Sequence, residues 1–120
     1  MIAEGDIVNL DVTLEKNGFI ADSSRTFLIG EVAPAARRLV RTTYEAMWKG
    51  ILAVRPGATL GDIGHAIDRH ARRAGYAVVR EYCGHGIGRE MHEDPQVLHS
   101  AGPAPVSRCV RAWSSPSSRC

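Results

Sequence analysis

The sequence predicts an α+β domain in which an antiparallel β-hairpin is followed by two helices, a strand and a glycine-rich loop. Three observations lead to this fold class. Residues 5–14 and 19–29 have the composition of strands and flank an Asn-Gly turn. Apolar residues recur at helical spacing in the next two segments, and residues 76–82 are rich in valine and tyrosine. A length of 120 residues, 44% of them hydrophobic, suits one domain with a modest core.

The first two strands are expected to pair across a tight turn. In residues 5–14, apolar side chains alternate with polar ones, as in a strand with one buried face. Asn17 and Gly18 tolerate the left-handed backbone that a two-residue hairpin turn requires. Residues 19–29 then return as the second strand, which Gly30 ends.

Two amphipathic helices are predicted next. Pro34 suits the first turn of a helix, and the Arg-Pro-Gly sequence at 55–57 ends that helix. Thr59 is predicted to cap the second helix, with Asp62 completing a capping box, and Gly75 ends it. The predicted apolar stripes are Leu39, Val40, Tyr44, Met47, Trp48, Ile51 and Leu52 in the first helix, and Leu60, Ile63, Ile67, Ala71 and Ala74 in the second.

The chain changes character after about residue 100. Residues 76–82 are predicted to form a buried strand, and the glycine-rich loop follows at 84–88. Residues 101–120 instead combine proline, serine, arginine and cysteine without helical or strand periodicity. We therefore expect one domain in residues 1–100 and a disordered tail in residues 101–120.

Composition argues against membrane insertion, secretion and nucleic-acid binding. No run of about 18 apolar residues occurs, and no basic segment followed by an apolar stretch resembles a signal peptide. The net charge is +2, and the arginine cluster at 69–73 is interpreted as a solvated helix face, because no aromatic residues are interleaved with it. Cys83, Cys109 and Cys120 are odd in number and form no CxxC pair, which favours free thiols in the cytoplasm over a zinc–thiolate site.

Two aspartates are candidate metal ligands. Asp11 lies among apolar neighbours on the first predicted strand, and Asp22 lies on the second, across the turn. The hairpin brings these carboxylates near each other, and a divalent cation between them would relieve their repulsion. A structural alternative stays open, in which Asp22 caps a turn with Ser23 and Ser24 while Asp11 accepts a backbone hydrogen bond.

Two histidines lie in and after the glycine-rich loop. His85 stands in the sequence Gly-His-Gly-Ile-Gly directly after the third predicted strand, where glycines allow a tight bend. A neutral imidazole is a good ligand for transition metals. His92 follows seven residues later, close enough to line the same cavity. The glycines do not match a dinucleotide-binding fingerprint, because Arg89 replaces its last glycine and no amphipathic helix follows.

Four segments carry a family resemblance. They are Asn-Leu-Asp-Val-Thr at 9–13, Gly-Phe-Ile-Ala-Asp-Ser-Ser-Arg-Thr-Phe at 18–27, Val-Val-Arg-Glu-Tyr-Cys-Gly-His-Gly-Ile-Gly at 78–88 and His-Glu-Asp-Pro-Gln-Val-Leu-His at 92–99. Together they resemble the type I methionine aminopeptidases of peptidase family M24. Prolidases and proline aminopeptidases share the His-Gly-Ile-Gly and His-Glu-x-Pro frame, but the Arg-Glu-Tyr-Cys and Pro-Gln-Val-Leu-His sequences favour methionine aminopeptidase.

The resemblance covers roughly residues 5–99. It implies a partial pita-bread fold in residues 1–100, without the family's N-terminal part, and it leaves residues 101–120 as a non-homologous tail. It also implies an activity, the hydrolytic removal of N-terminal methionine from nascent polypeptides. Such enzymes are cytoplasmic and usually monomeric, and they require neither nucleic acid nor a membrane.

The resemblance further implies a site for two divalent metal ions, which are Co, Mn, Fe, Zn or Ni in this family. By position, Asp11 would bind one metal, Asp22 would bridge both, and His85 would be the single histidine ligand. His92 would hydrogen-bond the substrate and steady the tetrahedral intermediate. Met91 falls where the family lines its pocket for the methionine side chain.

The match to the family site is incomplete. The family needs two further glutamates after the Pro-Gln-Val-Leu-His segment, one of which is the general base, and no Asp or Glu follows Asp94 here. Asp11, Asp22 and His85 alone cannot satisfy two cations that each bind about five or six donors. Glu93 and Asp94 are not expected to substitute, because the family does not use their positions as ligands. We therefore predict that this chain is inactive on its own.

Two other classes of function stay open. The chain could be a non-catalytic binding module that recognises nascent N-termini or a partner without a complete dinuclear site. It could also be a remnant without function, because strands at a broken edge of the fold would be unpaired.

Overall fold

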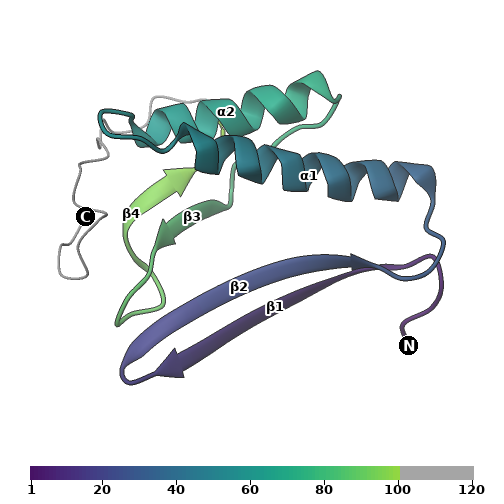
Figure 1. The fold of residues 1–120 in the computed structure, drawn as a ribbon, viewed down its shortest axis with the longest axis horizontal. Coiled ribbons are helices and arrows are strands. Elements are labelled where there is room, and N and C mark those ends of the chain that lie inside the picture. Colours follow the sequence, from purple (N-terminus) through teal and green to yellow (C-terminus); the bar gives the residue numbers. More distant parts are fainter. Residues whose placement is uncertain (101–120) are drawn as a thin grey trace.

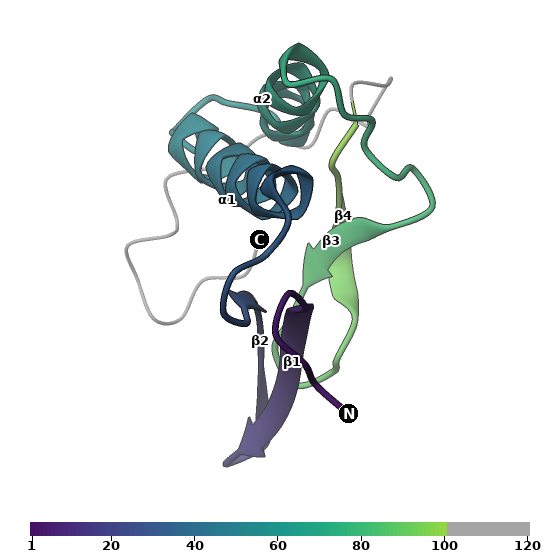
Figure 2. The same cartoon turned by 90° about the vertical axis from the view of Figure 1, so that its right-hand side faces the viewer.

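The computed structural model describes residues 1–100, which form two antiparallel strand pairs and two helices (Figure 1). The helices lie side by side in one layer, and the strand pairs lie beneath them (Figures 1 and 2). This arrangement confirms the predicted α+β class. The predicted tail, residues 101–120, lies outside the described residues. The elements are β1 (Ile7–Lys16), β2 (Phe19–Leu28), α1 (Pro34–Ala53), α2 (Leu60–Arg73), β3 (Cys83–Gly86) and β4 (Glu93–Leu98).

The predicted hairpin is confirmed as β1 and β2. Asn17 and Gly18 both have positive φ angles, of 56° and 75°, as a tight two-residue turn requires. Directly opposed residues share a face of the sheet, so the register separates the side chains into two sets. The polar face carries Asn9, Asp11, Thr13, Asp22, Ser24 and Thr26, and the apolar face carries Val8, Leu10, Val12, Leu14, Phe19 and Phe27.

Both predicted helices form, with the expected signals at their ends. Pro34 occupies the first turn of α1. Thr59 caps α2, because its Oγ1 accepts the Asp62 amide proton at 3.2 Å while the Asp62 carboxylate accepts the Thr59 amide proton at 2.7 Å. Gly75 follows α2 with a φ of 86°, a conformation that other residues rarely adopt.

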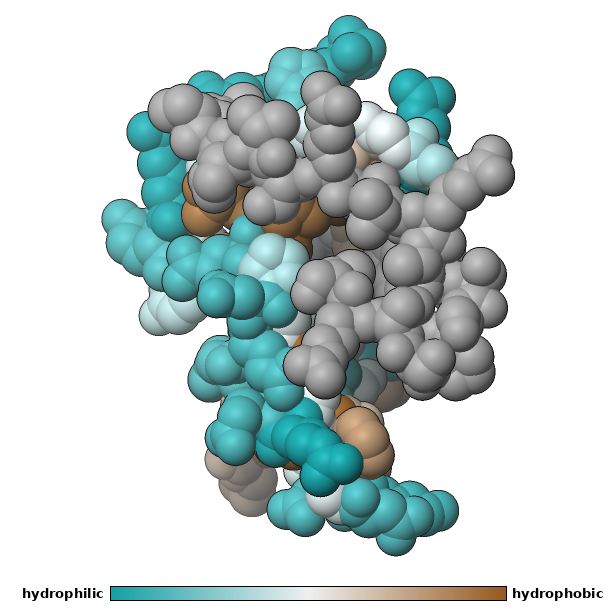
Figure 3. Space-filling view, turned by 90° about the vertical axis from the view of Figure 1, so that its left-hand side faces the viewer, coloured by the Kyte–Doolittle hydropathy of each residue, from teal (hydrophilic) through white to brown (hydrophobic). Residues whose placement is uncertain are grey.

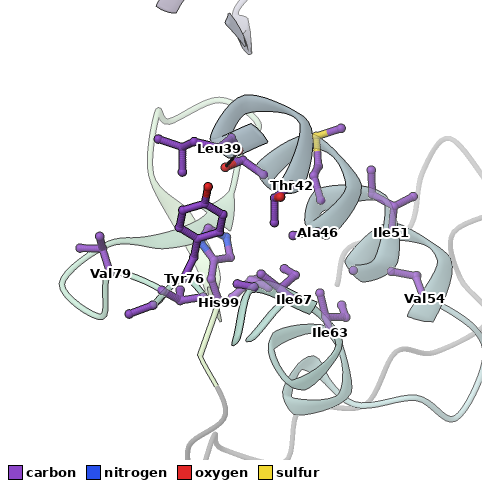
Figure 4. Close-up of a pocket in the computed structure, with 17 residues that line it drawn as sticks. Leu39, Thr42, Ala46, Ile51, Val54, Ile63, Ile67, Tyr76, Val79 and His99 are labelled. Atoms are coloured by element: carbon purple, nitrogen blue, oxygen red, sulfur yellow. Dashed lines mark hydrogen bonds between the residues drawn. The ribbon is translucent and has the colours of Figure 1, made fainter. Parts of the chain in front are cut away.

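The strand predicted at residues 76–82 is wrong. The third strand begins only at Cys83, and residues 76–82 form an irregular connection from the end of α2. Residues 76–79 line a cavity beside α1 instead, as Tyr76 and Val79 show in Figure 4, whereas Tyr82 is exposed. No strand among residues 1–100 pairs with this segment, so its β-branched composition has no sheet to join.

Strand β4 was not anticipated from the sequence. It pairs antiparallel with β3, with His85 opposite Gln96 and Gly84 opposite Val97. Its first residues are acidic and Pro95 interrupts it, so the alternation that identifies a strand is missing. Pairing with β3 decides its conformation.

Two glycines set the spacing between the layers. A Cβ atom on Gly50 of α1 would lie 2.8 Å from Ile67 Cδ1, so a larger residue here would require the Ile67 side chain to move. A Cβ atom on Gly64 of α2 would collide with the Leu98 carbonyl oxygen at the end of β4. Glycine at these two positions therefore allows α1 to pack closely on α2, and α2 to pack closely on the end of β4.

The core between these elements is thin and open. A cavity of about 580 Å³ lies among α1, α2, residues 76–79 and the end of β4 (Figure 4). The buried apolar side chains of the described residues are small: Val32, Ala46, Ala58 and Ala71. Larger residues of the predicted α1 stripe, including Leu39, Met47 and Ile51, line the cavity and stay exposed. Apolar side chains accordingly reach the surface among hydrophilic ones in Figure 3.

The capping box yields a stability prediction. Replacing Thr59 with alanine removes the side-chain acceptor for the Asp62 amide, so we expect the free energy of unfolding to fall by about 1 kcal/mol. Urea denaturation followed by circular dichroism measures the change. Thr43→Ala is the matched control, because Thr43 lies inside α1, where alanine is the better helix former. Equal loss in both variants would contradict the assigned cap.

His99 makes stability depend on pH. Burial beside the apolar cavity lowers the pKa of His99 from its ordinary value of 6.5, because the imidazolium loses hydration. The unfolded chain therefore binds this proton more readily than the folded one. The stability gained by keeping His99 neutral is fully present above about pH 6.5. It is lost as the pH falls from there through the pKa of His99 in the folded chain.

We expect His99→Phe to flatten the change in urea midpoint between about pH 7 and pH 5. Exposed His65 supplies the control, since His65→Gln should keep the slope of the original protein. If His99→Phe retains the full slope, another group causes it.

Candidate metal centre

A backbone hydrogen bond joins the first hairpin to the loop that follows β3. The Ile20 amide of β2 donates to the Gly88 carbonyl at 2.7 Å. Beside it, the Arg89 guanidinium carbon lies 5.1 Å from the centre of the Phe19 ring, within range of a cation–π contact. These contacts hold the glycine-rich loop against the start of β2, so segments far apart in the sequence contribute to one region.

The two candidate carboxylates share the polar face of the hairpin. Asp22 lies directly opposite Thr13, and Asp11 is two residues from Thr13 on the same strand, so all three project on one side. The Thr13 hydroxyl donates to Asp22 Oδ1 at 3.0 Å. Asp22 lies within β2, so the alternative in which it caps a turn is wrong. Both aspartates are exposed to solvent.

His85 is oriented by its own strand. Its Nδ1 lies 2.9 Å from the Gly86 carbonyl oxygen, and a proton on Nδ1 can be donated to that oxygen. Nε2 then carries the lone pair, which is the form of imidazole that binds a metal. The ring is half-buried on β3.

The structure brings His92 to His85. Their ring centres are 4.4 Å apart, with the planes inclined by 56°. His92 immediately precedes β4 and is exposed, while Met91 beside it is half-buried. The strand pair thus places both histidines at one end, which their spacing in the sequence could only suggest.

The candidate ligands fit a metal site only in part. Two carboxylates and an imidazole are donors that transition metals accept. Yet no three His, Cys, Asp or Glu side chains among residues 1–100 gather in one group able to hold an ion. The hairpin carries Asp11 and Asp22, and β3 carries His85, without a common centre. We therefore assign no catalytic step to a metal bound by these residues.

The carboxylate of Glu93 accepts backbone hydrogen bonds that were not predicted from the sequence. Its Oε1 accepts the amide protons of Arg89 at 2.8 Å and of Glu90 at 3.0 Å. One oxygen of this carboxylate is therefore engaged by the backbone of the turn. The sequence offered one indication of this contact: Glu93 follows Arg89 by four residues and Glu90 by three, a spacing at which an acidic side chain can accept backbone amide protons.

The chain resembles known proteins over most of its described length. The model of metallopeptidase family M24 matches residues 1–110. Methionine aminopeptidase of Rickettsia prowazekii is 52% identical over 98 residues, which are 82% of this chain and 38% of that protein.

None of the helices formed by residues 1–100 is both long and apolar enough to cross a bilayer.

Solved structures show the same fold. The crystal structure of methionine aminopeptidase from Rickettsia prowazekii matches with a TM-score of 0.82 and 48% identity, over 88% of this chain and 42% of that one. Prolidase from Pyrococcus furiosus matches with a TM-score of 0.77 and 27% identity, over 89% of this chain and 32% of that one.

These neighbours have the pita-bread fold, of which this chain forms a part. The higher identity to the aminopeptidase agrees with the resemblance inferred from the Arg-Glu-Tyr-Cys and Pro-Gln-Val-Leu-His sequences. The chain spans 38% of the length of its Rickettsia relative. With a family model matched along residues 1–110, the chain belongs to metallopeptidase family M24.

Proposed function

We propose that this chain is part of a methionine aminopeptidase, an enzyme that hydrolyses the peptide bond after the N-terminal methionine of nascent polypeptides in the cytoplasm. One observation carries the proposal: the rings of His85 on β3 and His92 just before β4 are in contact, and the loop between them is hydrogen-bonded to the hairpin that bears Asp11 and Asp22. The 52% identity to a methionine aminopeptidase supports an N-terminal methionine as the substrate, rather than the substrate of a prolidase.

The proposed roles follow the family positions. Asp11, Asp22 and His85 are ligands for a pair of divalent ions, of the Co, Mn, Fe, Zn or Ni type, in the complete site. Such ions lower the pKa of a bound water. His92 hydrogen-bonds the substrate peptide, and Met91 borders the methionine side chain. The free Nε2 of His85 and the shared polar face of the two aspartates support these assignments.

The same proposal makes this chain inactive on its own. A complete site needs a general base and more ligands than two carboxylates and one imidazole. No Asp or Glu follows Asp94 in the sequence, and the carboxylate of Glu93 is held by two backbone amides. A polypeptide that supplies the missing glutamates would be required for turnover.

A non-catalytic binding module is the second candidate, and a specific observation favours it. The apolar face of the hairpin is exposed, with Leu10 at 52%, Val12 at 52% and Leu14 at 59% of full exposure. Several neighbouring exposed apolar side chains are typical of surfaces that bind another polypeptide. Under this interpretation, metal binding is not expected at all.

Calorimetric titration with Co²⁺ distinguishes the two candidates. With three dispersed donors, we expect at most one weakly bound ion per chain, and we expect Asp22→Asn to abolish that binding. Asp6→Asn is the matched control, because Asp6 is an acidic residue before β1 whose carboxylate accepts the Ala3 amide proton. Tight uptake of two ions would contradict the incomplete site, and no uptake would favour the binding module.

A peptidase assay tests the predicted inactivity. We expect no release of methionine from the peptide Met-Ala-Ser in the presence of Co²⁺ or Mn²⁺, because the general base is absent. Free methionine is quantified by chromatography after incubation. Release that disappears in both Asp22→Ala and His85→Ala would overturn this prediction and show a working site.

A further inference from the structure

The turn between β3 and β4 folds around one carboxylate. Glu93 stands at the start of β4, and its Oε1 accepts hydrogen bonds from the backbone amides of Arg89, at 2.8 Å, and Glu90, at 3.0 Å. Hydrogen bonds to an ionised acceptor are about twice as strong as neutral ones. A single side chain thereby closes the turn that separates the two strands.

The turn leaves room for this carboxylate. A Cβ atom on Gly88 would lie 2.8 Å from Glu93 Oε1 and 2.9 Å from Oε2, closer than carbon–oxygen packing allows. The Gly88 amide also donates to the Glu90 carbonyl at 3.3 Å, within the same turn. Glycine at position 88 and the carboxylate at position 93 therefore fit each other.

The turn connects to both parts of the candidate site. On one side, the Gly88 carbonyl accepts the Ile20 amide proton from the hairpin at 2.7 Å. On the other side, Glu93 directly follows His92, whose ring lies 4.4 Å from the ring of His85. A change in the turn would alter both the hairpin contact and the histidine pair.

We propose that Glu93 is a positioning residue: its carboxylate clamps residues 88–93, holds His92 against His85 and keeps the turn attached to the hairpin. Glu93 touches neither substrate nor metal in this role. The benefit of holding His92 in place rests on the proposed function, whereas the hydrogen bonds of Glu93 in the turn do not depend on it. The role requires a side chain that accepts two amide protons at this reach, which alanine cannot do and glutamine can do only as a neutral acceptor.

The clamp is tested on the full chain without metal. Amide hydrogen exchange and ring ¹⁵N–¹H correlation spectra are recorded for Glu93→Ala, Glu93→Gln and Glu90→Gln. In Glu93→Ala, exchange of the Arg89, Glu90 and Ile20 amides should accelerate about tenfold or more, because each loses its partner or the turn that holds it. The ring signals of both histidines should shift, while amides in α2 keep their rates.

The two other variants sharpen the result. Glu93→Gln should restore most of the protection, since its carbonyl oxygen still accepts both protons. Glu90→Gln makes the same chemical change in the same turn, and the Glu90 side chain accepts none of the turn's amide protons, so it should behave as the unmodified chain does. Unchanged Ile20 exchange and ring signals in Glu93→Ala would overturn the clamp.

A uniform acceleration of all amides would also overturn it, because Glu93 would then serve general stability. If Glu93→Ala does not fold, Glu93→Gln decides: a small acceleration confined to the Arg89, Glu90 and Ile20 amides, as a weaker neutral acceptor requires, supports the clamp, and rates equal to those of the unmodified chain overturn it. A parallel Co²⁺ titration separates this inference from the proposed function. Failure of the unmodified chain to bind Co²⁺ counts against the metal site, whereas the metal-free exchange rates still decide the role of Glu93.

Discussion

The hydrogen bond from the Ile20 amide to the Gly88 carbonyl is the contact on which the candidate site depends. It joins the hairpin that carries the two aspartates to the turn that leads to His92. Neither strand pair buries enough surface to be stable alone in water. One short backbone contact, with the Phe19–Arg89 pair beside it, therefore determines whether carboxylates and imidazoles belong to one region. The Glu93 clamp preserves the carbonyl position that this contact needs.

The described residues leave much apolar surface uncovered. The helices meet closely at Gly50, and α2 meets the end of β4 closely at Gly64, yet the cavity beside them is open, and the apolar face of the hairpin is exposed. Relatives with the same fold are more than twice as long, so further chain is available there to cover such surfaces. Among residues 1–100, the candidate donors Asp11, Asp22 and His85 likewise share no centre that could hold an ion.

Much of the local structure could be predicted because it depends on neighbouring residues. The Asn17-Gly18 turn and the Thr59 capping box are set by backbone preference and short-range hydrogen bonds. The strand expected at residues 76–82 failed for the opposite reason. Its composition suited a sheet, but no described strand pairs with it, and residues 76–79 line the cavity beside the helices instead. Strand β4 was missed because pairing with β3, rather than alternation, makes it a strand.

By itself, the sequence determined the hairpin with its polar and apolar faces, the two capped helices and the motifs that identify the family. It also determined that no acidic residue follows Asp94. Only the tertiary structure decided that His92 meets His85, that the carboxylate of Glu93 is engaged by the turn, and that the three candidate ligands do not gather in one group. The physical reason is that those arrangements depend on contacts between distant segments and on side-chain orientation, which local patterns do not specify.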